Sequence, residues 1–514
     1  MRLSQAGWHG VAEGILRFSV AWLKTKFLSL KDMFPKDLRQ FLQETEKIGQ
    51  LSIIEGADCD EDIGPLTELT SERDGPALLF DKIKGFPRGF RVISNIYTST
   101  ERTSMALGLP TNLSKMGIIK EWRKKARSFS PLMPKEVSSG PICENTMKDE
   151  QINLHKLPAP KWHEQDGGRY IGTGNAVVLK DPDTGIVNIG AYRVMVHDEK
   201  TTGMWITPGR HGALIVQKYH ARGKPCPVAI VCGEEPAIFI ESSYTVPQDV
   251  PGFSFAGWLR GEPVEYIVSD ITGLPIPSNS EIVIEGEIPI EDLMLEGPFG
   301  EWRGYYSVRK PAPIVKVKTV RYRDDPINHG NPPLKPPLKG EVLAVNFIAA
   351  PAIWDALETA GIPDVQGVWV AEESSASMVT AISIRQRYAG HAMQAALVAG
   401  GCRAGGYTNR YVIIVDDDVD ITDPRDLWWA LGTRSDPETS INIVKDCWSS
   451  AGDMWLSKED IKAGKTTNTK AMIIACKPFY RKEEYPMVNR ISKEVRAKTE
   501  KKWQRVLAAM DGKS

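Results

Sequence analysis

Two carboxylates flank a short turn in the segment Glu296-Gly-Pro-Phe-Gly-Glu301. The turn is rigid, so it leaves little choice in where the two carboxyl groups point. Two carboxyl groups held close together cannot both ionise freely, so the pKa of one rises and that group can donate a proton near neutral pH. Turn chemistry alone favours a simpler interpretation, a surface β-turn with two solvated acids.

An arginine stands among apolar residues in the segment 188–197, which reads Asn-Ile-Gly-Ala-Tyr-Arg-Val-Met-Val-His. The alternation of a β-strand puts Arg193 on the same face as Met195 and His197, with Val194 on the opposite face. A buried arginine needs a carboxylate or a phosphate as its partner. The segment could also be an edge strand in which the Arg193 side chain extends to the solvent. Without other motifs, this alternative explains the segment equally well.

Two further segments place cations beside glycines. Thr207-Pro-Gly-Arg-His211 presents Arg210 and His211 at the start of a helix, where a phosphate binds well and a neutral imidazole can bind a metal. A hydrogen-bonded structural histidine is the simpler alternative. In the segment 400–406, glycines allow a ligand to approach and Arg403 could clamp a phosphate, although a plain turn explains the same residues. The acidic run 416–420 is interpreted as a solvated strand end followed by a turn and a helix cap.

In their order along the chain, these segments resemble the UbiD family of decarboxylases, which use prenylated FMN. The resemblance covers nearly the whole chain after about residue 36. Its motifs are, in order, Asn188 with Arg193, then Met195-Val-His-Asp198, His211, the segment 296–301 and the segment 415–420. Each motif is weak alone, and the ordered set is specific.

The resemblance implies a catalytic trio of Arg193, Glu296 and Glu301. Glu301 would protonate the carbon that carbon dioxide leaves, while Arg193 and Glu296 orient that acid and help bring the cofactor to its active form. Asn188 and His211 would bind a divalent metal, typically manganese, that ties the flavin phosphate to the protein.

The resemblance also implies the cofactor pocket. A potassium ion is expected around Ser242 and Ser243. The residues at positions that line the prenylated FMN are Asn188, Ile189, Gly190, Ala191, Tyr192, Arg193, Arg210, His211 and Arg403.

One position departs from the family pattern. The family has a third metal ligand, a glutamate five residues before the glycine of an Ala-Gly pair. Here that glycine is Gly257, and Gly252 stands at the ligand position. Asp249 and Glu241 are the candidate replacements, and otherwise the metal is bound weakly.

The expected function is a non-oxidative, reversible decarboxylation of an aromatic, heteroaromatic or α,β-unsaturated carboxylic acid. In these acids the carboxylate is attached to an sp² carbon. Loss of carbon dioxide leaves an anion on that carbon that no side chain can stabilise, so a cofactor is required. The resemblance to the family also implies that Trp205, Arg210 and Trp302 lie near the substrate. Two indoles favour an aromatic acid, and Arg210 could bind a second anionic group. Both tryptophans could also be ordinary core residues.

Two alternatives stay open at this point. The missing glutamate at Gly252 allows a partner-dependent or non-catalytic subunit of a carboxylase complex. An ordinary FMN oxidoreductase would bind unmodified FMN without needing the trio. The expected partners are a small acid, a flavin prenyltransferase that supplies the cofactor, and further copies of this chain in a homodimer or homohexamer.

The elements that position these residues indicate an α/β (α+β) protein of three domains. Residues 1–150 are expected to form an α/β domain with an amphipathic N-terminal helix. Residues 151–325 contain many short strands with turn residues between them, which predicts a closed or nearly closed β-barrel. The resemblance implies that this central domain is a split β-barrel of the flavin-reductase type. Residues 326–514 are expected to form an α/β domain that ends in an amphipathic helix over 487–509, packed on the body or on a partner subunit.

Alternating patterns give more exact expectations. Helices are expected at 36–50, 213–221, 352–360 and 392–398. Residues 328–340 are expected to be a loop or linker. Strands are expected at 51–54, 77–80, 91–94, 175–179, 192–196, 228–232, 237–240, 264–268, 281–285, 314–318, 368–370 and 411–415.

Charge and cysteine content narrow the class of protein. Lys and Arg number 64 against 65 Asp and Glu, a net charge of −1 that gives no reason to expect nucleic acid as a partner. The seven cysteines form no Cys-x-x-Cys pair, which favours a reducing compartment, here the cytoplasm. The apolar stretch 15–30 is too short and too charged to cross a membrane.

Overall fold

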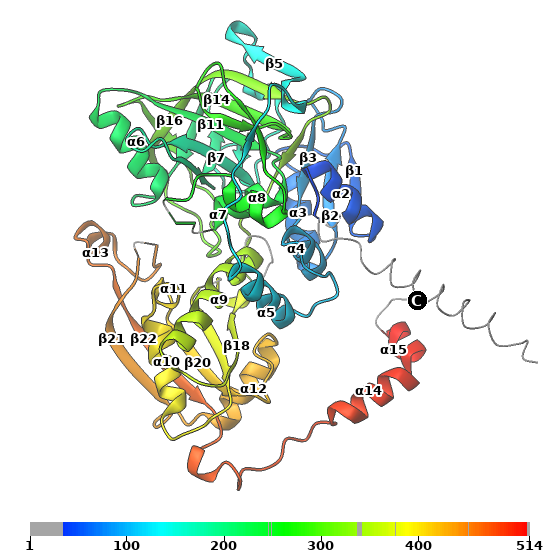
Figure 1. Ribbon diagram of the computed structural model, residues 1–514, viewed down its shortest axis with the longest axis vertical. Coiled ribbons are helices and arrows are strands. Elements are labelled where there is room, and N and C mark those ends of the chain that lie inside the picture. The colour runs from blue at the N-terminus through cyan, green and yellow to red at the C-terminus, as the bar shows by residue number, and fades with distance from the viewer. Residues whose placement is uncertain are drawn as a thin grey trace, which may run out of the picture.

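The computed structural model describes residues 34–510, apart from 245, 248, 337–341, 376 and 451. The elements form two lobes (Figure 1). The N-terminal and central segments build the upper lobe, and the C-terminal segment builds the lower lobe. The expected amphipathic N-terminal helix lies outside the described residues.

A four-stranded sheet with the order β1-β2-β3-β17 forms one side of the upper lobe. The expected strands at 51–54, 77–80 and 91–94 are confirmed. The segment 328–340 was predicted to be a loop, but it begins within a buried strand that runs parallel to β3. The elements are α2 (Leu38–Lys47), α3 (Ile63–Glu72), α4 (Thr100–Ala106), β1 (Leu51–Glu55), β2 (Ala77–Asp81), β3 (Arg91–Ser94) and β17 (Ile327–His329).

A ten-stranded antiparallel sheet forms the centre of the upper lobe. Its order is β6-β9-β10-β16-β14-β11-β7-β8, and β15 and β5 also pair with β16. The expected strands at 175–179, 192–196, 228–232 and 281–285 all belong to it. The split barrel of the flavin-reductase type stays a prediction. The strands are β5 (Asn145–Lys148), β6 (Tyr170–Gly172), β7 (Asn175–Lys180), β8 (Val187–Gly190), β9 (Arg193–Val196), β10 (Thr201–Trp205), β11 (Cys226–Cys232), β14 (Ile282–Ile288), β15 (Leu293–Glu296) and β16 (Lys310–Tyr322).

One predicted strand of this region is wrong. Residues 237–240 lie in α7 (Pro236–Ser243), a buried helix. Proline is favoured at the first helical position, and a helix buried on all sides has no polar face to reveal its period. The strand expected at 264–268 and the helix expected at 213–221 are confirmed. The other elements here are α6 (His211–Ala221), α8 (Ser254–Arg260), β4 (Lys135–Glu136), β12 (Glu265–Val268) and β13 (Pro275–Pro277).

The lower lobe contains a five-stranded sheet with the order β18-β19-β20-β22-β21. Strands β19, β20 and β22 are parallel, and helices pack on the sheet, as expected for an α/β domain. The predicted elements at 352–360, 368–370, 392–398 and 411–415 are confirmed. The elements are α9 (Val342–Thr359), α10 (His391–Gly401), α11 (Arg403–Gly406), α12 (Pro424–Arg434), α13 (Lys458–Lys462), β18 (Val365–Val370), β19 (Val379–Ile384), β20 (Tyr411–Asp416), β21 (Ile441–Trp448) and β22 (Thr467–Ala475).

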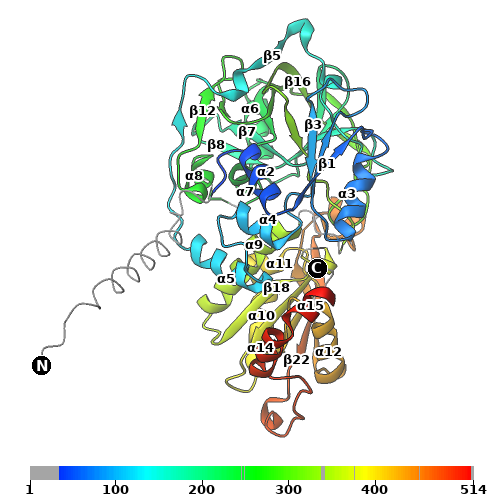
Figure 2. The same ribbon diagram turned by 90° about the vertical axis from the view of Figure 1, so that its right-hand side faces the viewer.

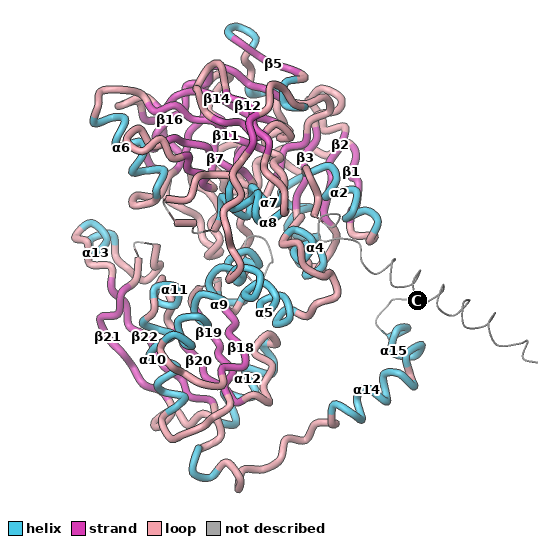
Figure 3. Tube along the Cα trace, in the orientation of Figure 1, coloured by secondary structure: helices cyan, strands magenta, loops and turns pink. Residues whose placement is uncertain are grey.

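The C-terminal helix is shorter than predicted and is divided. The segment 487–492 is not helical, and α14 (Lys493–Lys502) and α15 (Gln504–Met510) are separated at Trp503. Both helices lie to the side of the lower lobe, away from its sheet, in Figures 1 and 3, and they lie in front of that lobe in the turned view of Figure 2. Val495, Trp503 and Val506 are exposed, so the apolar stripe is not packed on the body of this chain.

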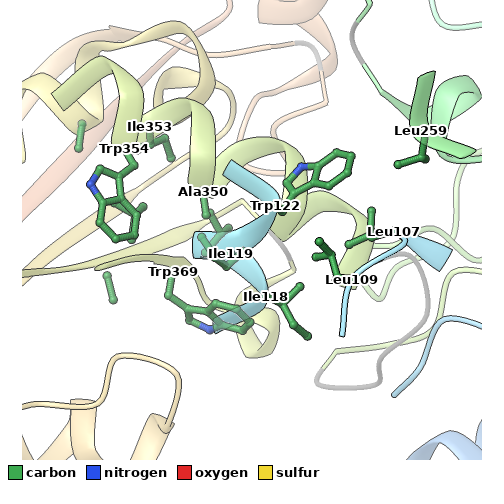
Figure 4. Packing of buried hydrophobic residues seen from close by; sticks show 14 of the residues in the cluster. Leu107, Leu109, Ile118, Ile119, Trp122, Leu259, Ala350, Ile353, Trp354 and Trp369 are labelled. Atoms are coloured by element: carbon green, nitrogen blue, oxygen red, sulfur yellow. The ribbon is translucent and has the colours of Figure 1, made fainter. Parts of the chain in front are cut away.

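Helix α5 (Lys115–Ala126) connects the two lobes through apolar packing (Figure 4). Ile118, Ile119 and Trp122 are fully buried in a core cluster that also contains Trp354 of α9 and Trp369 of β18. The same cluster includes residues of β7, β11 and β14 in the central sheet. The lobes therefore share one apolar core around α5.

Candidate active site

The arginine of strand β9 contacts both carboxylates of the predicted trio. Arg193 donates from Nε to Glu296 Oε1 at 2.7 Å and from Nη2 to Glu296 Oε2 at 2.8 Å. Its Nη1 donates to Glu301 Oε1. Burial opposes the charge of Arg193, but the bonds and charges of Glu296 and Glu301 raise its pKa above the ordinary value. The structure thus joins the three residues into one network.

Glu296 is the inner carboxylate of this network. It ends strand β15, and its side chain is 0% exposed. The Tyr170 hydroxyl donates to Glu296 Oε1 at 2.9 Å, and the Tyr170 ring packs at 4.3 Å from that of Phe299. Burial and the charge of Glu296 raise the pKa of Tyr170. Glu296 is therefore fixed as a buried carboxylate with both oxygens bonded.

Glu301 is the outer carboxylate. Its side chain is 32% exposed, and Arg193 is its single ion-pair partner among the described residues. The turn between the two acids is held from outside, because Gly300 donates to Asp166 Oδ1 at 2.9 Å and the Phe299 N–H donates to Ser307 Oγ at 3.1 Å. The solvated surface turn, the simpler interpretation of the sequence, is therefore wrong for Glu296.

The strand that carries Arg193 has the predicted alternation. Val194 and Val196 belong to one core cluster, together with residues of β11 and β14. Met195 belongs to a different cluster, with Tyr170 and Phe299. Arg193 lies on the same side, with its guanidinium 5.2 Å from the Phe299 ring.

Two residues beside the trio complete the site, and the sequence predicted only the first of them. Trp205 lies opposite Arg193 in the β9–β10 pair. Lys310 lies opposite Glu296 in the β15–β16 pair, and its Nζ is 3.2 Å from the centre of the Trp205 ring. Lys310 was missed because the strand was expected to begin at 314. Pro311 and Pro313 argued against a strand at its first residues, but β16 contains both of these prolines.

Asn188 and His211 are available as metal ligands. Asn188 Oδ1 is buried without a hydrogen-bond partner among the described residues, and an orphaned buried oxygen is suited to a cation. His211 is the first residue of α6, which begins two residues before the helix predicted at 213–221. Across the described residues there is no cluster of three or more His, Cys, Asp or Glu side chains that could hold a metal ion.

The position of the missing third ligand is tightly packed. A Cβ atom on Gly252 would lie 2.9 Å from both the Val187 carbonyl oxygen and Ile189 Cγ1. Glu241 is already engaged, since it accepts hydrogen bonds of 2.8 Å from the backbone N–H groups of Phe253 and Ala256. Burial raises the pKa of Glu241 to about 8. Glu241 therefore caps the start of α8, and each of its two oxygens already accepts a backbone hydrogen bond.

The predicted flavin positions 188–192 follow strand β8 into β9. Tyr192 packs between two glycines, because a Cβ atom on Gly190 or Gly212 would lie 2.6 Å from its hydroxyl oxygen. Gly212 donates its N–H to that hydroxyl at 3.2 Å. Ala191 donates its N–H to the Ser242 carbonyl at 3.0 Å, so that carbonyl of the expected potassium site already accepts one bond.

The remaining predicted residues are Arg210, Trp302 and Arg403, of which Trp302 directly follows Glu301 in the chain. Arg210 is the exposed residue that precedes α6, and Trp302 packs beneath the Arg303 guanidinium at 4.3 Å. Arg403 is exposed and begins α11 in the lower lobe. No hydrogen bond or ion pair joins Arg403 to the other predicted residues within the described ranges. The acidic run is an ion-pair network, with Asp418 bonded to Arg434 and Lys477.

Three family descriptions match the chain in the order in which its parts occur. They are the N-terminal domain (residues 42–121), the Rift-related domain (135–336) and the C-terminal domain (343–476) of 3-octaprenyl-4-hydroxybenzoate carboxy-lyase. A pyrrole-2-carboxylic acid decarboxylase from Pseudomonas aeruginosa is 32% identical over 417 residues, which are 78% of this chain and 83% of that protein.

Solved structures agree with these matches. The open form of vanillic acid decarboxylase from Sedimentibacter hydroxybenzoicus has 27% identity and a TM-score of 0.80, covering 93% of this chain and 99% of that one. The UbiD-class enzyme HmfF from Pelotomaculum thermopropionicum, in complex with FMN, has 25% identity and a TM-score of 0.79, covering 89% and 98%. The fold and the matches together define an enzyme of the carboxy-lyase class. The chain belongs to the UbiD family.

None of the helices in the described part of the chain has the length and apolar character needed to cross a membrane.

Proposed function

We propose that this chain removes carbon dioxide, reversibly and without oxidation, from an aromatic, heteroaromatic or α,β-unsaturated carboxylic acid. The proposal assigns Glu301 as the proton donor and Arg193 with Glu296 as the network that orients it. Decarboxylation with a prenylated flavin is supported by the family and by its relatives, one of which is solved with prenylated FMN.

One observation carries the residue assignment. A single guanidinium bonds two carboxylates, of which Glu296 is wholly buried and Glu301 is 32% exposed. A proton donor must reach the substrate and exchange its proton, and only Glu301 has that access. Glu296 receives both parallel bonds of the arginine fork, which fixes the position of the guanidinium.

Prenylated FMN, when bound, supplies the electrophile that takes up the electrons left by carbon dioxide. The residues that would hold it are the backbone and side chains of 188–193, together with Arg210, His211 and Arg403. The fit rests on the start of α6, where the N–H groups of the first helical turn and the Arg210 cation suit a phosphate.

The divalent metal fits this chain only in part. Asn188 and His211 offer one oxygen and one nitrogen, and glycine stands at position 252, where the family has a glutamate ligand. Manganese prefers oxygen ligands that include carboxylates. We therefore assign no step of the reaction to a metal, and we expect a metal at this position to be held mainly by the cofactor's own phosphate. A potassium ion near Ser242 and Ser243 remains part of the proposal.

The proposal also covers the oligomeric state of the chain and the source of its prenylated FMN. The exposed apolar residues of α14 and α15, among them Val495 and Trp503, support a homodimer or a homohexamer in which this segment contacts a partner subunit. A flavin prenyltransferase would supply the cofactor in the cytoplasm.

The test uses the full chain produced together with a flavin prenyltransferase, with aromatic acids as substrates. Glu301→Gln should lower kcat about 10²- to 10⁴-fold, because the amide cannot donate the proton. The matched control is Glu287→Gln, which removes a carboxylate of similar exposure that pairs with Lys318 on the same sheet. The control should retain wild-type turnover. A Glu301→Gln variant with wild-type kcat and an unchanged Tm would remove Glu301 as the acid.

Gly252 favours one second candidate, a subunit that needs a partner before it holds its cofactor. The packing around Gly252 leaves no room for the family's glutamate without movement of β8. Prenylated FMN retained by the purified chain would exclude this candidate. A colourless protein from cells with and without the prenyltransferase would favour it.

A further inference from the structure

Lys310 shares the face of the sheet that carries the trio. It lies directly opposite Glu296 in the antiparallel β15–β16 pair, while Trp205 lies directly opposite Arg193 in the β9–β10 pair. Directly opposite residues of antiparallel strands project to the same side. The charges that act on Lys310 are those of Arg193, Glu296 and Glu301, which places its ammonium beside the network.

The ammonium of Lys310 has an aromatic partner but no anionic one. Its Nζ lies 3.2 Å from the centre of the Trp205 ring, and no carboxylate lies within ion-pair distance among the described residues. The other lysines of the same strand differ, because Lys316 pairs with Asp292 and Lys318 pairs with Glu287. The carboxylates nearest to Lys310 are those already bonded by Arg193.

The half-buried ammonium of Lys310 loses part of its hydration, and contact with an indole face offsets only part of that loss. Burial and the neighbouring Arg193 charge lower the pKa of Lys310. An anion that entered beside Trp205 would gain a charge-assisted bond with a cation that is already held in place.

Resting on the proposed function, we propose that Lys310 and Trp205 form a subsite for a second carboxylate of the substrate. The acid that this chain prefers is then an aromatic dicarboxylate. The carboxylate that leaves lies at the Arg193–Glu301 side, and the one that stays pairs with Lys310. Arg210, the cation that the sequence suggested for this role, is exposed at the start of α6 and is left to the cofactor phosphate.

The experiment measures binding, so it does not depend on turnover. Pyrrole-2-carboxylate and pyrrole-2,5-dicarboxylate are titrated into the cofactor-loaded full chain by calorimetry. Wild type should bind the dicarboxylate about tenfold or more tightly than the monocarboxylate, as expected for one added charge-assisted bond. Lys310→Met should lose this preference, and Lys310→Arg should keep most of it.

Lys318→Met is the matched control. It removes the same charge from the same strand, outside the site, and should keep the preference for the dicarboxylate. If Lys310→Met does not fold, Trp205→Phe and Lys310→Arg still test the subsite, because the first should weaken the preference and the second should retain it.

The outcomes separate this inference from the proposed function. A preference that survives in folded Lys310→Met, or a wild type that binds both acids equally, overturns the subsite. Loss of flavin from Lys310→Met with an unchanged preference also overturns it, because Lys310 would then serve the cofactor. A preference that depends on Lys310 in a chain that decarboxylates no acid would support the subsite while the proposed function fails.

Discussion

Two arginines, one in each lobe, hold a pair of carboxylates. Arg193 in the upper lobe bonds Glu296 through two nitrogens and Glu301 through a third. Arg434 in the lower lobe bonds Asp418 at 2.6 and 2.8 Å and a second aspartate, at the end of β20, at 3.2 Å. The two networks have similar bonds between arginine and carboxylates, but they differ in the number of cations that contact the more exposed acid, which is Glu301 in one network and Asp418 in the other.

Asp418 is held by a second cation, the Lys477 ammonium, at 2.9 Å. Burial alone would raise the pKa of Asp418, but bonds and charges from Arg434 and Lys477 lower it to about 2. Such an acid gives up no proton near neutral pH. Glu301 has one arginine N–H and no second cation among the described residues. The number of fixed cation contacts therefore separates a structural ion pair from the site of proton transfer that we propose at Glu301.

The largest effect is expected from Arg193→Met. The substitution leaves Glu296 buried without its cation, which should lower the free energy of unfolding by about 3–5 kcal/mol. Turnover should be lost as well. Urea unfolding and kcat measure the two effects. An unchanged unfolding midpoint would mean that the Arg193–Glu296 pair contributes no stability.

Arg434→Met should destabilise the chain less, by about 2 kcal/mol, because Asp418 keeps Lys477 as its partner. The activity of each folded molecule should stay at the wild-type level. The same unfolding assay and active-site titration check both points. A fall in kcat equal to that of Arg193→Met would break the distinction between the two networks.

Tyr170→Phe removes one hydrogen bond to the buried Glu296 and keeps the packing on Phe299. The expected loss is about 1.5 kcal/mol of unfolding free energy, the usual value for a bond to a charged group. Thermal unfolding at matched pH provides the measurement. Greater stability than wild type would show that Glu296 does not need this donor.

Asp418→Asn should have the smallest effect, below about 1 kcal/mol, since the carboxylate is partly exposed and screened. Its pKa is lower in the folded chain than the ordinary 3.8, so its contribution to stability is present above about pH 4 and is lost as the pH falls toward 2. The difference in unfolding free energy between wild type and variant should shrink over that interval. A difference independent of pH would contradict the assignment.

The trio was expected from the family resemblance, and the structure joins its three residues in one hydrogen-bonded network. Glu296 and Glu301 flank one turn, and Arg193 begins a strand whose alternation is confirmed by two separate core clusters. Strands with short continuous apolar runs, such as β7 and β20, were found because such a run is also local information. The sequence could not show that Arg193 gives its two parallel bonds to Glu296, because that choice depends on the pairing of distant strands.

The failures also have physical causes. Helix α7 was predicted as a strand because burial on every side removes the helical period. Lys310 was missed because prolines argue against a strand, whereas β16 tolerates both of them. The continuous C-terminal helix was predicted from an apolar stripe, yet that stripe is exposed at Val495 and Trp503, so no packing within this chain holds it together.

Strand β17 has a consequence for the order of events during synthesis. The sheet of the first segment contains β1, β2 and β3, but its fourth strand comes from residues 327–329, which follow the whole central sheet. A ribosome that has made the first 150 residues has therefore made an unfinished sheet with an open edge at β3. The edge of β3 stays unpaired, or must be covered by another molecule, until the central segment has been synthesised and β17 can pair with β3.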